Sequence, residues 1–327
     1  MKGKIGFEEH CAILDTVEET KDFAGDSGRF DAFTMELLDL DDQRLARMDA
    51  AGIKLAMLSL NAPGIQSIPD VELAIATARK ANDTIAAAIA RHPSRYAGLA
   101  ALPMQDPDAA ALELKRCVTE LGFKGALVNG HTQRQVTDSA VYYDIPEYRD
   151  FWAMVSALDV PFYLHPRMGQ LSQSANLMDH PWLRSAPWGF SVETSIHALR
   201  LCGSGLFDDF DNLKIVVGHL GEFIPYNLWR IDARMRFSPR GYRGKRPLGD
   251  YFRQHFHVTT SGNFCDASFR CALEMLGQER LYFSSDYPFE RMSEAAEWFD
   301  NTTVIDNDQR RQIGRDNAIR LFKLDLA

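Results

Sequence analysis

The chain has 327 residues, of which 46% are hydrophobic and 25% are charged, a balance typical of globular proteins that suits one (β/α)8 barrel or two smaller domains. The formal net charge of −9 argues against nucleic acid as a partner, because neutralising phosphates requires clustered Lys and Arg side chains. No apolar stretch approaches the roughly 18 residues that a bilayer span requires, and the N-terminus lacks an apolar run of signal-peptide length, so we expect neither membrane association nor secretion.

Short apolar, β-branched or aromatic runs alternate with longer helical stretches along the chain. The strand candidates span residues 4–7, 55–60, 96–102, 125–129, 160–165, 214–219, 257–261 and 281–285. Strands separated by helix-length segments are typical of βα units in a parallel sheet. Eight such units in this length fit a closed barrel better than an open sheet. The sequence therefore predicts an α/β fold, a single (β/α)8 (TIM) barrel domain over residues 1–327.

Helix-start and helix-stop signals lie between the strand candidates. A helix predicted over residues 41–51 ends before Gly52, which is typical of the position that follows a helix. Apolar residues recur at steps of three and four over residues 71–89, as on one face of a helix. Asp106 followed by Pro107 predicts an N-cap and the first helical residue.

The cysteines indicate a reducing compartment. Their number is five, and no Cys-x-x-Cys pair occurs. A cytoplasmic protein with free thiols is the simplest explanation. We expect each cysteine to be a small buried hydrophobic residue rather than a ligand, and Cys11, beside His10, is the one that most needs checking.

Polar and ionisable side chains stand at the ends of the strand candidates. They are Glu8-Glu9-His10, Asn61, Asn129-Gly130-His131, His165, His219, Ser261-Gly262-Asn263 and Ser285-Asp286. In a (β/α)8 barrel the C-terminal ends of all the strands meet at one rim, where active sites are built. Side chains from the two ends of the chain should therefore become neighbours.

Two imidazoles and two carboxylates among these residues suit one metal ion. Glu8 and His10 are two residues apart, so in a strand they point to the same side, whereas Glu9 points away. Adding His165 and Asp286 gives a set that binds Zn²⁺ or Mn²⁺ with room for water or substrate. Each histidine alone could be an ordinary strand-end residue, but their joint placement favours a metal site.

A second cluster follows the sixth strand candidate. His219 ends that strand, and Glu222 lies where the next helix should begin. Glu222 could hydrogen-bond the imidazole and fix its tautomer, as catalytic dyads require, or it could only complement a helix N-terminus. Arg230, two helical turns further on, could bind a substrate carboxylate through two parallel hydrogen bonds, or it could form a surface ion pair.

At these residues the sequence resembles the decarboxylases of the amidohydrolase superfamily. The segments that carry the resemblance are GKIGFEEH, LSLNAPGIQ, LGFKGALVNG, PFYLHP, IVVGHLGE, PYNLWRID, SSDYPFE and NAIRLFKLD. They extend from the first residues to the last, so the resemblance covers essentially the whole chain. The group includes γ-resorcylate (2,6-dihydroxybenzoate), 2,3-dihydroxybenzoate and 5-carboxyvanillate decarboxylases. Glu-Glu-His at residues 8–10 and the segment LNAP make the first of these the most similar.

The resemblance implies a role for each candidate residue. The positions that match the metal ligands of the family are Glu8, His10, His165 and Asp286. The catalytic His–Glu pair falls on His219 and Glu222, and the arginine that contacts substrate falls on Arg230. Phe23 and Asn61 stand where substrate-binding residues that line the pocket are expected.

Two departures from the wider superfamily favour a single metal ion. Its hydrolases usually begin with His-x-His, whereas Glu8 occupies the first ligand position here. Asn129 stands at the end of the fourth strand candidate, where a two-metal site would have a bridging lysine. Both changes favour a mononuclear centre over a two-metal hydrolytic one.

The implied reaction is a reversible, non-oxidative decarboxylation of 2,6-dihydroxybenzoate to resorcinol and CO₂, with 2,3-dihydroxybenzoate, 5-carboxyvanillate or salicylate as alternative substrates. Direct loss of CO₂ would leave an aryl anion in the ring plane. If C1 is protonated first, an ortho-hydroxyl lone pair stabilises the cationic ring. Asp286 is the expected proton donor, while His219, oriented by Glu222, would polarise the carboxyl or phenol.

Two other classes of function stay open at this stage. A metal-dependent hydrolase of an ester, lactone or amide would use His219 or Asp286 as the base on a metal-bound water. A binding module stabilised by metal would keep its ligand affinity without Asp286 and have no turnover to lose. The family is usually tetrameric, and an interface or a pocket cap could use the aromatic residues Trp182, Trp188 and Phe190.

Overall fold

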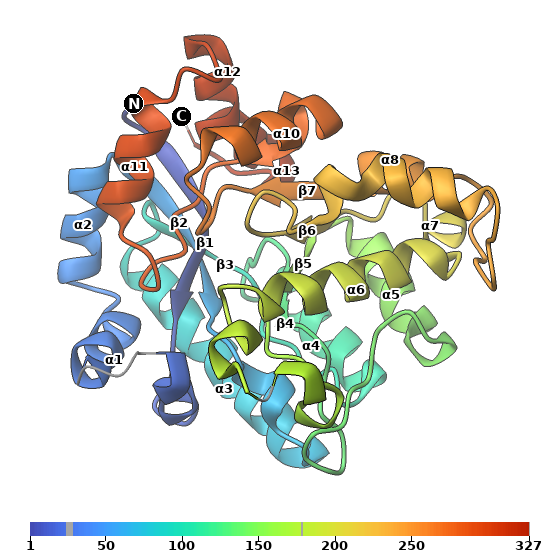
Figure 1. Ribbon diagram of the computed structural model, residues 1–327. Helices are drawn as coiled ribbons and strands as arrows, with labels where there is room; N and C mark the ends of the chain where they lie inside the picture. Colours follow the sequence, from blue (N-terminus) through green and yellow to red (C-terminus); the bar gives the residue numbers. More distant parts are fainter. Residues whose placement is uncertain (24–28, 178, 327) are drawn as a thin grey trace.

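The computed structural model describes residues 1–23, 29–177 and 179–326, and a parallel β-barrel lies at its centre (Figure 1). Within these residues the strands are β1 (Lys4–Cys11), β2 (Ile53–Leu60), β3 (Tyr96–Gly98), β4 (Ala126–Asn129), β5 (Phe162–His165), β6 (Ile215–Val217), β7 (Phe256–Thr259) and β8 (Leu281–Tyr282). Every ladder between neighbouring strands is parallel. The alternation of strands and helices in the sequence is the cause, because consecutive parallel strands need a crossover between them.

Two contacts close the ring of strands. The ladders form one sheet of β1, β2 and β3 and another that runs from β4 to β8. Ala100, just after β3, bridges to Ala126 of β4, and Glu9 of β1 bridges to Tyr287 after β8. The amide of His10 donates to the carbonyl of Tyr287 at 2.8 Å. Each strand candidate thus contributes to one closed barrel, and the predicted fold is confirmed.

Some strand ends differ from the prediction. β1 continues to Cys11, past the expected end at Phe7, because its last residues pair with β2. β8 ends at Tyr282 rather than Ser285, since the chain beyond it contacts β1 partly through side chains. The amide of Glu8, for example, donates to Ser284 Oγ at 2.6 Å.

Helices surround the barrel on its outer side. They are α1 (Phe30–Leu38), α2 (Gln43–Ala51), α3 (Val71–Arg91), α4 (Pro107–Thr119), α5 (Arg149–Leu158), α6 (Gly189–Gly203), α7 (Leu206–Asp209), α8 (Ile224–Met235), α9 (Leu248–His255), α10 (Asp266–Leu276), α11 (Met292–Asn301), α12 (Asn307–Arg311) and α13 (Asn317–Phe322). Gly52 ends α2 at φ 69°, and the Asp106 side chain caps α4 with Pro107 as its first residue. The predicted start and stop signals at these positions are confirmed.

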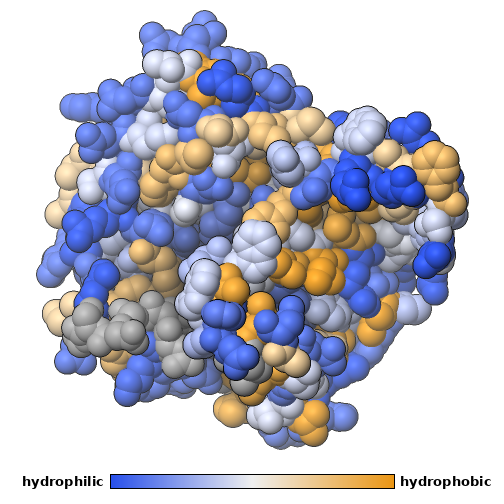
Figure 2. Space-filling model, in the orientation of Figure 1, coloured by the Kyte–Doolittle hydropathy of each residue, from blue (hydrophilic) through white to orange (hydrophobic). Residues whose placement is uncertain are grey.

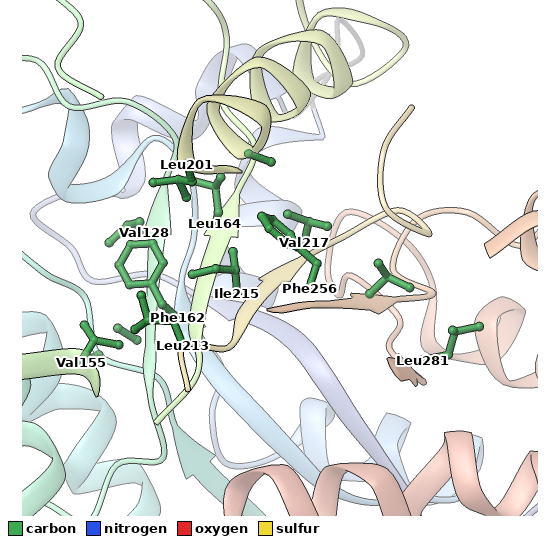
Figure 3. Close-up of a cluster of buried hydrophobic side chains, with 14 of the residues drawn as sticks. Val128, Val155, Phe162, Leu164, Leu201, Leu213, Ile215, Val217, Phe256 and Leu281 are labelled. Atoms are coloured by element: carbon green, nitrogen blue, oxygen red, sulfur yellow. The ribbon is translucent and has the colours of Figure 1, made fainter. Parts of the chain in front are cut away.

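Apolar side chains fill both sides of the strands. Outside the barrel, Val128, Leu164 and Ile215 pack against helices that contribute Val155 and Leu201 (Figure 3). Inside it, a second cluster is joined by residues of α13 and is built from Leu99, directly after β3, and the strand residues Ile5, Phe7, Leu55, Met57, Ala97, Leu127, Tyr163, Val216 and Tyr282. The barrel is therefore a packed core rather than an open channel. In the described part of the chain, none of the helices combines the length and apolar character of a membrane span.

Candidate metal centre and active site

Four candidate ligands meet at the C-terminal mouth of the barrel. Glu8 and His10 come from β1, His165 is the last residue of β5, and Asp286 follows β8. One ligand atom from each lies within 4.8 Å of the others. All four are buried, the most accessible being Asp286 at 8%. The structure thus brings together the set that the spacing and the resemblance predicted as metal ligands.

A β-bulge in β1 aims Glu8 at this point. Gly6 pairs with Ala56 of β2 and Glu9 pairs with Leu58, so β1 advances three residues while β2 advances two. Bulges of this kind redirect a side chain and are common beside active sites.

The bulge places two consecutive side chains inside the barrel. The Phe7 ring packs against the ring of Tyr163 with centroids 5.7 Å apart, and Glu8 accepts a hydrogen bond from the hydroxyl of the same tyrosine. Glu9 turns away, as expected, and accepts a hydrogen bond from the amide of Ser285 at 3.0 Å. Strand periodicity alone would have placed Phe7 and Glu8 on opposite faces.

The ligand atoms face one another without hydrogen-bond partners in the described structure. Glu8 Oε1, His10 Nε2 and Asp286 Oδ1 are buried and unpaired. His10 Nε2 lies 3.2 Å from Asp286 Oδ1 and 3.4 Å from Glu8 Oε1, and His165 Nε2 lies 3.1 Å from Glu8 Oε1. Buried polar atoms normally have a partner, so atoms left unpaired around one point need an explanation. Two imidazole nitrogens and two carboxylate oxygens fit a divalent metal ion.

Burial and neighbouring charges have opposite effects on the pKa values of His10 and Glu8. Burial alone would lower the pKa of His10, but the carboxylates of Asp286 and Glu8 raise this pKa to about 9. Burial alone would raise the pKa of Glu8, but contacts with His10 and His165 hold it well below its ordinary value. Carboxylates and imidazoles are thus strongly coupled at the mouth of the barrel, and a divalent ion bound there would displace protons from the imidazoles, because metal ligands must be deprotonated.

The far side of each β1 ligand is held by hydroxyl groups. His10 Nδ1 lies 3.1 Å from Ser59 Oγ, and Glu8 Oε2 accepts hydrogen bonds from Tyr163 and Thr259. Such outer contacts fix the orientation of metal ligands. Cys11 is not among them, because its Sγ donates to the carbonyl of Ser59 and burial raises its pKa to about 11.

His219 and Glu222 form the expected pair beside the four ligands. His219 Nδ1 lies 2.8 Å from Glu222 Oε1, and His219 Nε2 lies 3.5 Å from Asp286 Oδ2. Ser191 of α6 donates to Glu222 Oε2 at 2.6 Å. Burial would lower the pKa of His219, but the charge of Glu222 and the contact with Asp286 raise it well above its ordinary value. Glu222 precedes α8 and binds the imidazole, so the structure supports the dyad interpretation over helix-end complementarity.

The loops that carry these residues adopt unusual backbone conformations. His219 has φ 52°, Glu222 has φ 57° and Asp286 has φ 69°, all in the left-handed region that non-glycine residues seldom occupy. Such conformations persist only where surrounding contacts enforce them, and they gather at functional sites. The sequence contains no signal for these conformations.

The positions of the predicted substrate-binding residues neither support nor contradict their roles as clearly as the positions of the four candidate ligands do. Asn61 follows β2, is 1% exposed, and leaves its Oδ1 without a hydrogen-bond partner in the described structure. Phe23 ends a 3-10 helix (Val17–Phe23), but its side chain lies outside those that the structure describes. Arg230 is exposed on α8, and in the described part of the chain it makes no hydrogen bond or ion pair with the four ligands or with the His219–Glu222 pair.

Several side chains of the site were absent from the prediction. Tyr163 and Thr259 could have been found by strand periodicity, since each stands two residues before another inward-facing position. Phe289 packs its ring edge-on against His10 at 5.6 Å, and only its place soon after Asp286 points to it. Ser191 lies in a helix far from the other residues in sequence, and no pattern indicates it.

Comparison with known proteins places the chain in a family. A family model described as amidohydrolase matches residues 38–324. The sequence is 52% identical to the γ-resorcylate decarboxylase of Rhodococcus jostii (strain RHA1), and the match covers 99% of this chain and 100% of that protein.

Solved structures give the same result. A 2,6-dihydroxybenzoate decarboxylase complexed with 2,6-dihydroxybenzoate is 48% identical, with a TM-score of 0.97 over 99% of this chain and 100% of that one. A dihydroxybenzoic acid decarboxylase from Polaromonas sp. JS666, with bound manganese and the inhibitor 2-nitroresorcinol, is 47% identical, with a TM-score of 0.97 over 100% of this chain and 98% of that one. The predicted resemblance is confirmed: the chain belongs to the amidohydrolase family and is similar over its whole length to the γ-resorcylate decarboxylases in it.

Proposed function

We propose that the protein is a metal-dependent carboxy-lyase that converts 2,6-dihydroxybenzoate reversibly to resorcinol and CO₂. The observation that carries the proposal is the convergence of Glu8, His10, His165 and Asp286 at the mouth of a barrel whose sequence is 52% identical to a γ-resorcylate decarboxylase. The relatives whose structures hold 2,6-dihydroxybenzoate or 2-nitroresorcinol favour this ring pattern over 2,3-dihydroxybenzoate, 5-carboxyvanillate or salicylate.

We propose Glu8, His10, His165 and Asp286 as the ligands of one divalent ion, and Mn²⁺ rather than Zn²⁺ as that ion. These nitrogen and oxygen donors tolerate either metal, and the manganese bound to the Polaromonas relative favours the first. When bound, the ion would act as a template and Lewis acid for the carboxylate and the ortho-phenolate of the substrate.

Asp286 is the proposed proton donor to C1. Its Oδ1 faces the other ligands, and its Oδ2 lies 3.5 Å from His219 Nε2, so the carboxyl can exchange a proton with the imidazole or with the phenol of the substrate. Proton delivery to C1 makes the C–H bond, the C1–CO₂ bond then breaks, and its electron pair restores the aromatic ring. The balance is one proton consumed and one CO₂ released. His219, held by Glu222, would polarise the carboxyl or the phenol.

Asn61 and Arg230 are proposed substrate contacts, with Phe23 as a third that lines the pocket. The unpaired and buried Oδ1 of Asn61 could accept a hydrogen bond from a phenolic hydroxyl. For Arg230 the support is the resemblance and the fork geometry of guanidinium with carboxylate. Replacing Arg230 with Met should raise KM for 2,6-dihydroxybenzoate and change kcat less, whereas an unchanged KM would contradict the assignment.

We also propose a cytoplasmic homotetramer with one domain over residues 1–327. The apolar groove between α6 and α8 and the exposed Tyr226, Trp229 and Phe237 offer an interface (Figure 2). Free thiols at all five cysteines suit a reducing compartment. Strands from both ends of the chain close the same barrel, which supports one domain. Light scattering after gel filtration tests the tetramer.

The function is tested by a product assay on the Mn²⁺-loaded protein. We expect resorcinol and CO₂ from 2,6-dihydroxybenzoate, with slower turnover of the other three acids. In D₂O the product should carry one deuterium at the former C1 position, because the proton comes from an exchangeable group. Hydrolysis of an ester, lactone or amide without CO₂ release would instead establish the hydrolase alternative.

A further inference from the structure

Three buried hydroxyl groups lie beneath the metal ligands, inside the barrel. The Tyr163 hydroxyl donates a hydrogen bond to Glu8 Oε2, and Thr259 Oγ1 donates to the same oxygen at 3.3 Å. The two hydroxyls are 3.0 Å apart. Ser261 Oγ lies 2.8 Å from Thr259 Oγ1 and accepts from the amide of His219 at 3.3 Å. The hydroxyls thus form a chain from the first ligand to the backbone of the catalytic candidate.

Strand geometry explains why these side chains meet. Tyr163 stands two residues before His165 in β5, and Thr259, the last residue of β7, stands two residues before Ser261. Alternate residues of a barrel strand face the interior, so the hydroxyls of Tyr163 and Thr259 lie one layer below the rim. Tyr163 is 1% exposed and the other two hydroxyl residues are fully buried. Protein groups must therefore satisfy the inner oxygen of Glu8.

The two carboxylate oxygens of Glu8 have different surroundings. Oε2 is occupied by two hydroxyl donors, whereas Oε1 faces His10 and His165 without a hydrogen-bond partner in the described structure. The bulge of β1 leaves Glu8 outside the regular ladder with β2, so its side-chain contacts gain importance for its orientation.

We propose that Tyr163 is a positioning residue of the metal centre, which together with Thr259 holds Glu8 as a ligand through one oxygen and thereby sets the affinity of the site for a divalent ion. The proposal rests on the metal site of the proposed function. Its physical basis is that a carboxylate oxygen held by two buried donors cannot turn toward the ion without breaking both hydrogen bonds.

The test is titration of the metal-free protein with Mn²⁺ alone, with free Mn²⁺ followed by electron paramagnetic resonance. Replacing Tyr163 with Phe removes one hydroxyl and keeps the ring that packs on Phe7. We expect the Kd for Mn²⁺ to rise by about 10- to 100-fold, the usual effect of losing an outer contact. A Kd equal to that of the wild type would overturn the proposal.

Tyr282 offers a matched control in the same barrel. Its ring also packs against Phe7, and its hydroxyl lies 2.7 Å from His257 Nδ1 rather than beside a proposed ligand. Replacing Tyr282 with Phe should leave the Kd for Mn²⁺ unchanged, although it too removes a buried hydroxyl. An equal loss of affinity in both variants would mean that the barrel was disturbed generally, which contradicts a specific role for Tyr163.

Thr259 provides the second measurement if the Tyr163 variant fails to fold. Replacing Thr259 with Val keeps the shape and removes the hydroxyl, whereas Ser keeps the hydroxyl. We expect weaker Mn²⁺ binding in the Val variant and near-normal binding in the Ser variant. Equal affinities in the two would overturn the proposal. A wild-type protein that binds Mn²⁺ but releases no CO₂ would contradict the proposed reaction alone, and one that binds no divalent ion would contradict both.

Discussion

The two ends of the barrel bury the same residue type with opposite results. His10 at the C-terminal mouth and His257 near the opposite end are both enclosed. The pKa of His10 is raised to about 9, while the pKa of His257 is lowered to about 3. Burial acts in the same direction on both imidazoles, because it disfavours the charged form.

The neighbouring charges decide the difference. His10 faces the carboxylates of Asp286 and Glu8, which outweigh burial, whereas Arg280 and Lys214 add to the effect of burial on His257. The partners differ as well. Both ring nitrogens of His257 are engaged, Nδ1 with the hydroxyl of Tyr282 at 2.7 Å and Nε2 with Arg280 at 3.1 Å.

The comparison shows which end of the barrel has unpaired polar groups that can bind a ligand. The end of the barrel opposite the mouth is called the closed end here, because α13 packs Phe322 against Phe7 with ring centroids 4.5 Å apart. The buried polar groups around His257 at this end hydrogen-bond with one another. At the mouth, His10 Nε2 and two carboxylate oxygens converge without hydrogen-bond partners in the described residues. The polar groups at one end pair with each other, whereas the mouth directs unpaired nitrogen and oxygen atoms toward a common point.

The largest expected effect is at the proposed proton donor. Replacing Asp286 with Asn should abolish turnover of 2,6-dihydroxybenzoate while the protein keeps bound Mn²⁺, because an amide cannot deliver the proton to C1. CO₂ release and metal content of the purified variant measure the two properties separately. An active Asn variant would contradict the role of Asp286, and replacing Tyr282 with Phe at the closed end should leave turnover unchanged.

The His219–Glu222 pair should give the next largest effect. Replacing Glu222 with Gln removes the carboxylate that raises the pKa of His219 and orients its ring. We expect kcat to fall by roughly 10²- to 10⁴-fold, the usual contribution of acid–base catalysis. Steady-state kinetics at saturating substrate checks this result, and full activity would show that Glu222 has only a structural role.

Metal removal should destabilise the mouth of the barrel. Without a cation the carboxylates there repel each other, and an ion that binds only the folded protein stabilises it by about 2.7 kcal/mol when present at 100 times its Kd. Thermal unfolding of chelator-treated protein, with and without added Mn²⁺, measures this stabilisation. Equal Tm values under the two conditions would count against a metal site among these residues.

The smallest expected effect is a pH dependence at the closed end. The pKa of His257 is about 3 in the folded chain and about 6.5 when unfolded, so its contribution to stability is present above pH 6.5 and is lost as the pH falls toward 3. From pH 6.5 to 5 this loss amounts to about 2 kcal/mol. Urea unfolding of metal-free protein should show a smaller loss in a His257→Asn variant. Equal losses in the two proteins would contradict the lowered pKa.

The sequence by itself determined the barrel and the four side chains that meet at its mouth. Eight apolar runs separated by helix-length segments predict a parallel barrel, and parallel strands bring their C-terminal ends to one rim. The predicted positions Glu8, His10, His165 and Asp286 meet there. Ligand types at strand ends are local features, which is why they can be identified without coordinates.

Only the tertiary structure decided how those residues are held. The bulge that turns both Phe7 and Glu8 inward depends on the register between β1 and β2, and the left-handed backbone at Asp286 depends on contacts around its loop. The hydroxyls of Tyr163 and Thr259 reach Glu8 across 155 and 251 residues of sequence. The alternation of residues along a strand predicts which face a side chain occupies, but it does not predict where a β-bulge interrupts that alternation. The position of the bulge depends on the register between strands, which is set by packing between distant segments.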